Sequence, residues 1–206
     1  MSQKRLHRPA ILSILGLILS LWTAGLWGTA AAQQGAPAQP TPPVAPALLA
    51  IGDPAPDFAL KDQTGAIRRA SEIWKSSPLV LYFYPADFTP GCTKEAHAFA
   101  EVDSLIRARG ANLVGVSVDP VESHARFAEH CGAAFPLLAD TTAAVARAYG
   151  AAFELNRDGR SRTVARRVTY LIDAKGTIAR SWVVSDPLIH PEEVVRALPL
   201  GVMKGE

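Results

Sequence analysis

Cysteine is scarce in this chain, which has only Cys92 and Cys131 among its 206 residues. Two thiols are too few for the framework of several disulfides that stabilises many small secreted domains. They also exclude the paired short spacings of structural zinc sites and the Cys-x-x-Cys motif of thiol–disulfide exchange enzymes. We therefore expect cysteine chemistry to begin at a single thiol rather than at a closely spaced pair.

A large excess of charge of either sign is also missing. The 21 lysines and arginines are nearly balanced by 19 aspartates and glutamates, which gives a net charge of +2. Apart from residues 157–167, the basic side chains are scattered along the sequence, so no surface for a polyanion is indicated. We expect no nucleic-acid partner.

The histidines do not form a metal-binding pattern. His97, His124 and His130 lack the short paired spacings of structural zinc sites, and we expect them to be surface residues. The sequence therefore predicts no metal and no cofactor.

The N-terminus has the features of an export segment. Basic residues within 4–8 precede an apolar run over residues 10–27, and residues 30–32 form a small-residue cleavage site. The run is long for a signal peptide and short for a membrane-spanning helix, so residues 1–32 are interpreted either as a cleaved signal peptide or as an uncleaved membrane anchor. In both cases the positive charge precedes the apolar run, which predicts export to the periplasm or another extracytoplasmic space.

Residues 33–50 differ in composition from the rest of the chain. They are rich in Gln, Ala and Pro and show no apolar periodicity, which indicates a semi-rigid linker or a disordered start of the mature chain. From residue 51 onwards apolar segments alternate with turn residues. We expect residues 51–206 to form one folded domain.

The most informative stretch begins at residue 79. Residues 79–84 form a continuous apolar run of β-formers, as expected for a strand that is buried on both faces. Thr89 and Pro90 then have the residue types that begin helices, which places Cys92 in the first helical turn. There, unpaired backbone N–H groups and the positive end of the helix dipole favour a thiolate over a thiol. The pattern predicts an activated nucleophile at the end of a central strand.

The remaining patterns predict an α/β fold. A small antiparallel hairpin is expected around residues 58–67, and Ser71 is expected to cap one helical turn. Apolar residues at helical spacing continue from Cys92 to Gly110, and a buried strand follows at 112–118, so that strand, helix and strand form a βαβ unit with parallel strands. Helices are expected at residues 121–130 and 142–149. A hairpin is expected at residues 168–184, and a final helix is expected from Pro191 onwards.

Residues 82–95, YFYPADFTPGCTKE, resemble the active-site signature of peroxiredoxins. The resemblance is strongest to the bacterioferritin-comigratory, or Q-type, subgroup of the alkyl hydroperoxide reductase/thiol-specific antioxidant family. It extends over residues 51–198 and includes GDPAPDF at 52–58, GVSVD at 115–119, FPLLAD at 135–140 and RVTYLID at 167–173. It implies a thioredoxin-like fold with a central mixed sheet flanked by helices. It also implies a thiol-dependent peroxidase that reduces hydrogen peroxide and organic hydroperoxides in antioxidant defence.

The resemblance implies roles for four residues. Cys92 would be the peroxidatic cysteine, whose thiolate attacks a peroxide oxygen and becomes a sulfenic acid. Thr89 would hold the peroxide through its hydroxyl, and Pro85 would shield the thiolate from water. Arg167 would polarise the O–O bond and keep Cys92 ionised.

The roles of two further residues are assigned only from where they lie in the sequence. Only the match of residues 167–173 to the family selects Arg167 over its neighbour Arg166. Glu95 lies one helical turn after Cys92, and we expect it to order neighbouring groups rather than to transfer protons.

The chain departs from many Q-type relatives five residues after Cys92, where His97 replaces a resolving cysteine. A disulfide within this helix is therefore excluded. Either Cys131 is the resolving cysteine, or it packs as a small hydrophobe one turn from Phe127 and an outside thiol reduces the sulfenic acid. The resemblance implies a hydroperoxide substrate, a thioredoxin-like or small-molecule thiol reductant, and a monomer or weak homodimer, tethered to the membrane if the N-terminal segment is uncleaved.

Two other functions share the expected fold. An exported thioredoxin-like thiol–disulfide oxidoreductase or a copper-handling protein usually needs two close cysteines, which the sequence lacks. A binding domain without catalysis would not need the threonine, cysteine and arginine together.

Overall fold

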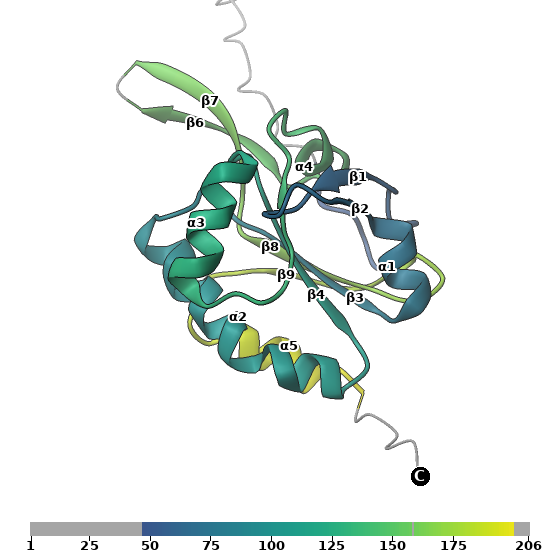
Figure 1. Ribbon diagram of the computed structural model, residues 1–206. Helices are drawn as coiled ribbons and strands as arrows, with labels where there is room; N and C mark the ends of the chain where they lie inside the picture. Colours follow the sequence, from purple (N-terminus) through teal and green to yellow (C-terminus); the bar gives the residue numbers. More distant parts are fainter. Residues whose placement is uncertain (1–46, 158, 200–206) are drawn as a thin grey trace, which may run out of the picture. The chain divides into compact units, whose positions relative to one another are not determined.

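The computed structural model describes residues 47–157 and 159–199, and its central sheet is mixed. The strands of this sheet are β3 (Leu79–Phe83), β4 (Asn112–Ser117), β5 (Leu137–Ala139), β8 (Val168–Ile172) and β9 (Ile178–Val183). They lie in the order β5–β4–β3–β8–β9 (Figure 1). β4 is parallel to β3 and β5, whereas β8 is antiparallel to β3 and β9. The predicted parallel βαβ unit is therefore confirmed.

Helices cover both faces of this sheet: α1 (Ala70–Ser76), α2 (Pro90–Ala108), α3 (Val121–Cys131), α4 (Ala144–Ala148) and α5 (His190–Ala197). Successive side chains of a strand point to opposite faces, and β3 is buried on both. Leu79, Leu81 and Phe83 pack in one hydrophobic cluster with residues of α1 and α4. Val80 and Tyr82 pack in a second cluster with residues of α2, α3 and α5.

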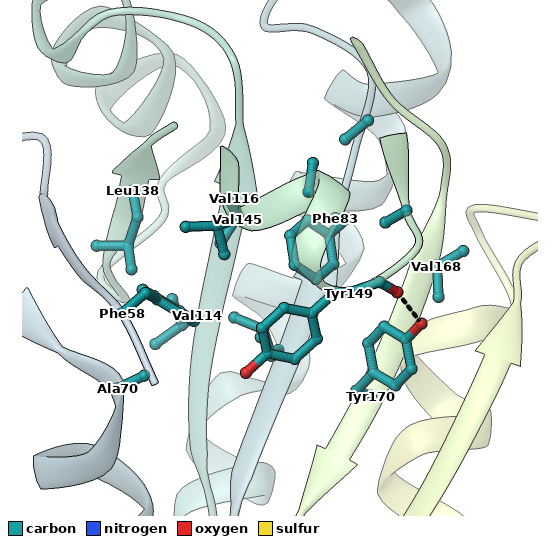
Figure 2. Close-up of a cluster of buried hydrophobic side chains, with 14 of the residues drawn as sticks. Phe58, Ala70, Phe83, Val114, Val116, Leu138, Val145, Tyr149, Val168 and Tyr170 are labelled. Carbon is teal, nitrogen blue, oxygen red and sulfur yellow. Dashed lines mark hydrogen bonds between the residues drawn. The ribbon is translucent and has the colours of Figure 1, made fainter. Parts of the chain in front are cut away.

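The first cluster buries two tyrosines whose hydroxyls are both satisfied. Tyr170 donates a hydrogen bond to the backbone oxygen of Tyr149 at 2.6 Å (Figure 2), and Tyr149 donates to the backbone oxygen of Pro56 at 2.7 Å. Buried polar groups require such partners. Leu48 and Leu49 also pack against this cluster, immediately before the expected start of the domain at residue 51.

Two antiparallel hairpins lie outside the central sheet. β1 (Ala59–Lys61) pairs with β2 (Ile67–Arg69), which confirms the predicted N-terminal hairpin. β6 (Ala152–Arg157) pairs with β7 (Arg160–Ala165) in a ribbon that projects from the domain (Figure 1). The sequence did not predict this ribbon or the short strand β5.

The helix boundaries differ from expectation in two places. Ser71 does not cap α1, because its backbone N–H and its hydroxyl both donate to the Asp57 carboxylate at 2.9 Å, and the N-cap is Arg69. Helix α4 is shorter than the expected 142–149. By contrast, α3 ends as predicted at Gly132, whose left-handed conformation has φ 65°.

The predicted export segment at residues 1–32 and most of the predicted linker at 33–50 lie outside the described residues. Within residues 47–157 and 159–199, no helix combines the length and the hydropathy needed to cross a membrane. Export of the chain therefore stays a prediction.

Candidate active site

Cys92 lies in the first turn of α2, close in sequence to the carboxyl end of the central strand β3. The helix begins as predicted, with Thr89 as N-cap and Pro90 at its first residue, where a missing N–H costs no helical hydrogen bond. Cys92 is only 1% exposed. Its sulfur is therefore shielded from water at the end of the helix where backbone N–H groups favour negative charge.

Arg167 brings a positive charge to Cys92. Its Nη2 atom lies 3.3 Å from the Cys92 sulfur. Gly91 permits this approach, since a Cβ atom at that position would lie 3.1 Å from the same nitrogen. The neighbouring Arg166 donates instead to the backbone oxygen of Gly150 at 2.6 Å. Of the two arginines considered from the sequence, the structure places Arg167 against Cys92.

Glu95 is the second partner of Arg167. The Glu95 carboxylate is 0% exposed and forms an ion pair with Arg167, while its Oε1 atom has no hydrogen-bond partner among the described residues. Burial raises the pKa of Glu95 to about 7, although the Arg167 charge acts in the opposite direction. Burial also opposes the charge of Arg167, but Glu95 and Cys92 together raise the pKa of its guanidinium. Glu95 thus orders the group that contacts Cys92, as its position had suggested.

The loop between β3 and α2 carries Pro85 and Thr89, which are both half-buried. The Thr89 hydroxyl donates to the backbone oxygen of Ala86 at 3.1 Å and makes no capping hydrogen bond to the helix. Because its hydrogen is used in this way, the Thr89 oxygen keeps acceptor capacity for an O–H group. The structure therefore brings Pro85, Thr89 and Cys92 together on one loop and helix start, with Arg167 beside them.

Cys131 is the last residue of α3 and is 2% exposed. Its sulfur lies 4.0 Å from the backbone oxygen of Thr93, the residue after Cys92. Burial raises the pKa of Cys131 to about 11, and the charges of Asp87 and Cys92 act in the same direction. Neither cysteine is in a disulfide. Cys131 is therefore close to the candidate active site but is a neutral thiol there.

One of the three histidines expected at the surface is not there. His97 and His130 are exposed, as predicted, but His124 is 0% exposed and its Nδ1 atom lies 2.9 Å from the Asp87 carboxylate. The prediction for His124 was wrong because it ignored the helical spacing of residues 124, 127, 128 and 131, all of which are buried on α3. Among residues 47–157 and 159–199, no three His, Cys, Asp or Glu side chains gather to hold a metal ion.

Comparisons with known proteins agree with this geometry. Residues 51–181 match the AhpC/TSA family. A protein of Coxiella burnetii named as peroxiredoxin bcp is 36% identical over 150 residues, which cover 73% of this chain and 99% of the relative. The chloroplastic peroxiredoxin Q of Triticum aestivum is 40% identical over 127 residues, which cover 62% of this chain and 56% of that protein.

Solved structures show the same relationship. Peroxidoxin BcpB from Mycobacterium tuberculosis superposes with a TM-score of 0.65 at 36% identity, covering 72% of this chain and 95% of that one. A structure of the Xanthomonas campestris bacterioferritin comigratory protein, from work on its alkyl peroxide reduction activity, has a TM-score of 0.63 at 33% identity, covering 68% of this chain and 89% of that one. These neighbours identify the mixed sheet and its helices as a thioredoxin-like fold. The chain belongs to the AhpC/TSA family and is a peroxiredoxin, a thiol-dependent hydroperoxide reductase.

Proposed function

We propose that Cys92 is the peroxidatic cysteine and that Arg167, Thr89 and Pro85 assist it. The observation that carries this assignment is the 3.3 Å contact between Arg167 Nη2 and the buried Cys92 sulfur. A guanidinium cannot lose its proton at ordinary pH, so it supplies a permanent positive charge to a thiolate. Cys92 also lies in the first turn of α2, where free backbone N–H groups and the positive end of the helix dipole favour a thiolate.

The thiolate sulfur attacks the nearer peroxide oxygen, so that an S–O bond forms while the O–O bond breaks. The electron pair of the broken bond goes to the far oxygen, which leaves as hydroxide or alkoxide and takes a proton from solvent to become water or an alcohol. Arg167 stabilises the charge that develops on this oxygen. Thr89, whose hydrogen is donated to Ala86, accepts the O–H of the bound peroxide. Pro85 borders the site and has no N–H group to offer to water.

The substrates are hydrogen peroxide and organic hydroperoxides. The half-buried loop and the charge of Arg167 recognise the O–O–H group itself, which both classes share. The alkyl peroxide reduction studied in the Xanthomonas campestris relative supports the organic class. Initial rates with hydrogen peroxide and with an alkyl hydroperoxide, measured on the same protein, test whether both are reduced.

Consumption of peroxide in the presence of dithiothreitol tests the assignment of Cys92. Cys92→Ser is expected to reduce the rate to the uncatalysed background, because a serine hydroxyl is not ionised at neutral pH. Cys131→Ser is the matched control for the loss of a buried thiol, since dithiothreitol can reduce the sulfenic acid without it. An unchanged rate in Cys92→Ser would overturn the assignment.

The sulfenic acid is then reduced by Cys131 or by a thiol from a thioredoxin-like or small-molecule reductant. Either thiol condenses with the sulfenic acid to give a disulfide and water. The 4.0 Å contact of Cys131 with the Thr93 backbone favours the internal route, whereas the raised pKa of Cys131 disfavours it. Mass spectrometry after one equivalent of peroxide separates the two, since the internal route gives a Cys92–Cys131 disulfide and the external route leaves the sulfenic acid.

The reaction is proposed to take place outside the cytoplasm, with or without a membrane tether. This rests on the basic and apolar pattern of residues 1–32. N-terminal sequencing of the mature protein tests it: a start near Gln33 supports cleavage, and an intact N-terminus in the membrane fraction supports an anchor. An intact N-terminus in the cytoplasmic fraction would contradict export.

A further inference from the structure

The loop that carries Thr89 is attached to α3 through one buried carboxylate. Asp87 accepts hydrogen bonds from the Tyr84 hydroxyl at 2.8 Å, the Ser123 hydroxyl at 2.7 Å and His124 Nδ1 at 2.9 Å. Tyr84, Asp87, Ser123 and His124 are here called the Asp87 cluster. Two of its members come from the end of β3 and the following loop, and two come from α3. The cluster therefore joins the peroxide-binding loop to the helix that ends at Cys131.

The burial of this cluster makes its hydrogen bonds necessary. Asp87 is 8% exposed and His124 is 0% exposed, and a buried carboxylate without donors would be strongly destabilised. Carboxylate oxygens accept hydrogen bonds, so the contact with Asp87 fits the tautomer of His124 that carries its hydrogen on Nδ1. The Nε2 atom of His124 has no hydrogen-bond partner among the described residues. His124 is thus held by its Nδ1 contact, and its ring lies 6.3 Å from the ring of Tyr84 between centroids.

Two further contacts hold the same loop. The Asp87 backbone N–H donates to the Asp119 carboxylate at 2.8 Å, after the end of β4. The next residue, Phe88, has φ 58°, a conformation that non-glycine residues adopt only when their surroundings hold them there. Its ring packs against Phe127 of α3 at a centroid distance of 5.2 Å. Asp87 and Phe88, the two residues immediately before Thr89, are therefore anchored, the first by hydrogen bonds and the second by an aromatic contact.

This arrangement bears on the reaction because displacements of about 1 Å between reacting groups can lower rates by about two orders of magnitude. The Thr89 hydroxyl and the Cys92 sulfur have to meet one peroxide molecule from two sides. We propose that Asp87 and His124 are positioning residues that hold the loop from Pro85 to Thr89 in the geometry that accepts the peroxide. The inference rests on the proposed peroxidase function of Cys92 and adds to it residues that touch neither substrate nor sulfur.

The test compares two substitutions of His124 that differ in where they place a hydrogen-bond donor. The side-chain nitrogen of asparagine is attached to Cγ, as Nδ1 is in histidine, whereas that of glutamine is one carbon further out. His124→Gln is expected to lower the rate constant for oxidation of Cys92 by hydrogen peroxide about tenfold. His124→Asn is expected to restore it to within about threefold of the wild type, because it can still donate to Asp87.

A second measurement separates positioning from a general loss of structure. Alkylation of Cys92 by iodoacetamide needs the thiolate but not the peroxide geometry, so its rate is expected to stay within about twofold in His124→Gln. Partial unfolding would expose Cys92 and increase alkylation. His97→Gln is the matched control, since it makes the same substitution at an exposed histidine outside the Asp87 cluster, and its peroxide rate is expected to equal that of the wild type.

A milder variant covers the case in which His124→Gln does not fold. Ser123→Ala removes one donor to Asp87 and is expected to lower the peroxide rate two- to threefold with unchanged alkylation. Equal peroxide rates in wild type and in every folded variant of the Asp87 cluster would overturn the inference, as would parallel changes in peroxide and alkylation rates. Failure of the peroxidase proposal is distinct, because the wild-type protein would then consume no peroxide through Cys92.

Discussion

The first turn of α2 and the last turn of α3 each bury one cysteine, and their surroundings differ. Cys92 and Cys131 are 1% and 2% exposed, so burial does not distinguish them. Cys92 lies at a helix N-terminus with the Arg167 guanidinium 3.3 Å away. Cys131 lies at a helix C-terminus, where the dipole disfavours negative charge, and burial raises its pKa to about 11. The comparison shows that nearby charges and helix ends, and not solvent exposure, distinguish the surroundings of the two buried thiols.

Differential labelling tests this comparison most directly. At pH 8 a thiol with a pKa of about 11 is ionised to only about one part in a thousand. We expect iodoacetamide to alkylate Cys131 much more slowly than Cys92, and the Cys131 rate to gain about tenfold per pH unit between pH 8 and pH 10. Peptide mass spectrometry after timed labelling measures both rates. Equal labelling of the two cysteines at pH 7 would contradict the difference in their surroundings.

Removal of the Arg167 charge should make the surroundings of Cys92 more like those of Cys131. Arg167→Gln keeps a hydrogen-bond donor but loses the positive charge beside Cys92, and we expect the rate constant for peroxide reduction to fall about a hundredfold. Stopped-flow measurement of the first oxidation gives this rate constant. Arg166→Gln is the matched control, because Arg166 contacts the backbone of Gly150 and not Cys92. Similar losses in both variants would mean that Arg167 acts through the fold rather than on the sulfur.

The negative charge of Glu95 works against the positive surroundings of Cys92, and its effect depends on pH. The pKa of Glu95 is raised in the folded protein from 4.5 to about 7, so its carboxylate destabilises the folded state. The free energy of unfolding should therefore fall as pH rises from about 4.5 to 7, by about 3 kcal/mol for this group.

Glu95→Gln removes that titration. Relative to the wild type, its free energy of unfolding should increase by about 3 kcal/mol between pH 4 and pH 8, because the other carboxyl groups titrate in both proteins. Denaturant unfolding at a series of pH values measures the difference. Parallel pH profiles for the two proteins would show that Arg167 fully compensates the burial of Glu95.

The smallest effect is expected at Cys131 itself. Cys131→Ala removes a buried sulfur from the second hydrophobic cluster and should lower the free energy of unfolding by about 1 kcal/mol. Thermal or denaturant unfolding of the reduced proteins measures this change. A loss above about 3 kcal/mol would show that Cys131 has a structural role beyond the packing of a small hydrophobe.

The sequence predicted those features that depend on local pattern. The apolar run at 79–84, the turn chemistry of Thr89 and Pro90, and the helical spacing after Cys92 are all local, and each corresponds to an observed element. The family motif added Arg167, which is distant in sequence but aligned with a recognisable strand. Local signals and a motif together were sufficient for β3, β4, β8 and β9 of the central sheet, for the main helices and for the residues around Cys92.

The missed features depend on contacts between distant segments. Asp87 and His124 are unremarkable in sequence, and only the packing of the loop against α3 brings them together. The projecting ribbon of β6 and β7 follows from the pairing of two short segments rich in charged residues, which have little apolar alternation to indicate strands. Ser71 has the right residue type for a cap, but Asp57 takes both of its donors.

The packing of Leu48 and Leu49 has a consequence for where the chain can be cut. A Cβ atom on Gly150 would lie 2.0 Å from the backbone oxygen of Ala47, so any side chain at position 150 would push this N-terminal segment away. Truncation at residue 51, where the family match begins, would remove the segment and expose the apolar surface beneath it. The smallest fragment that retains the whole folded unit therefore begins before Leu48, within what composition alone assigns to a linker.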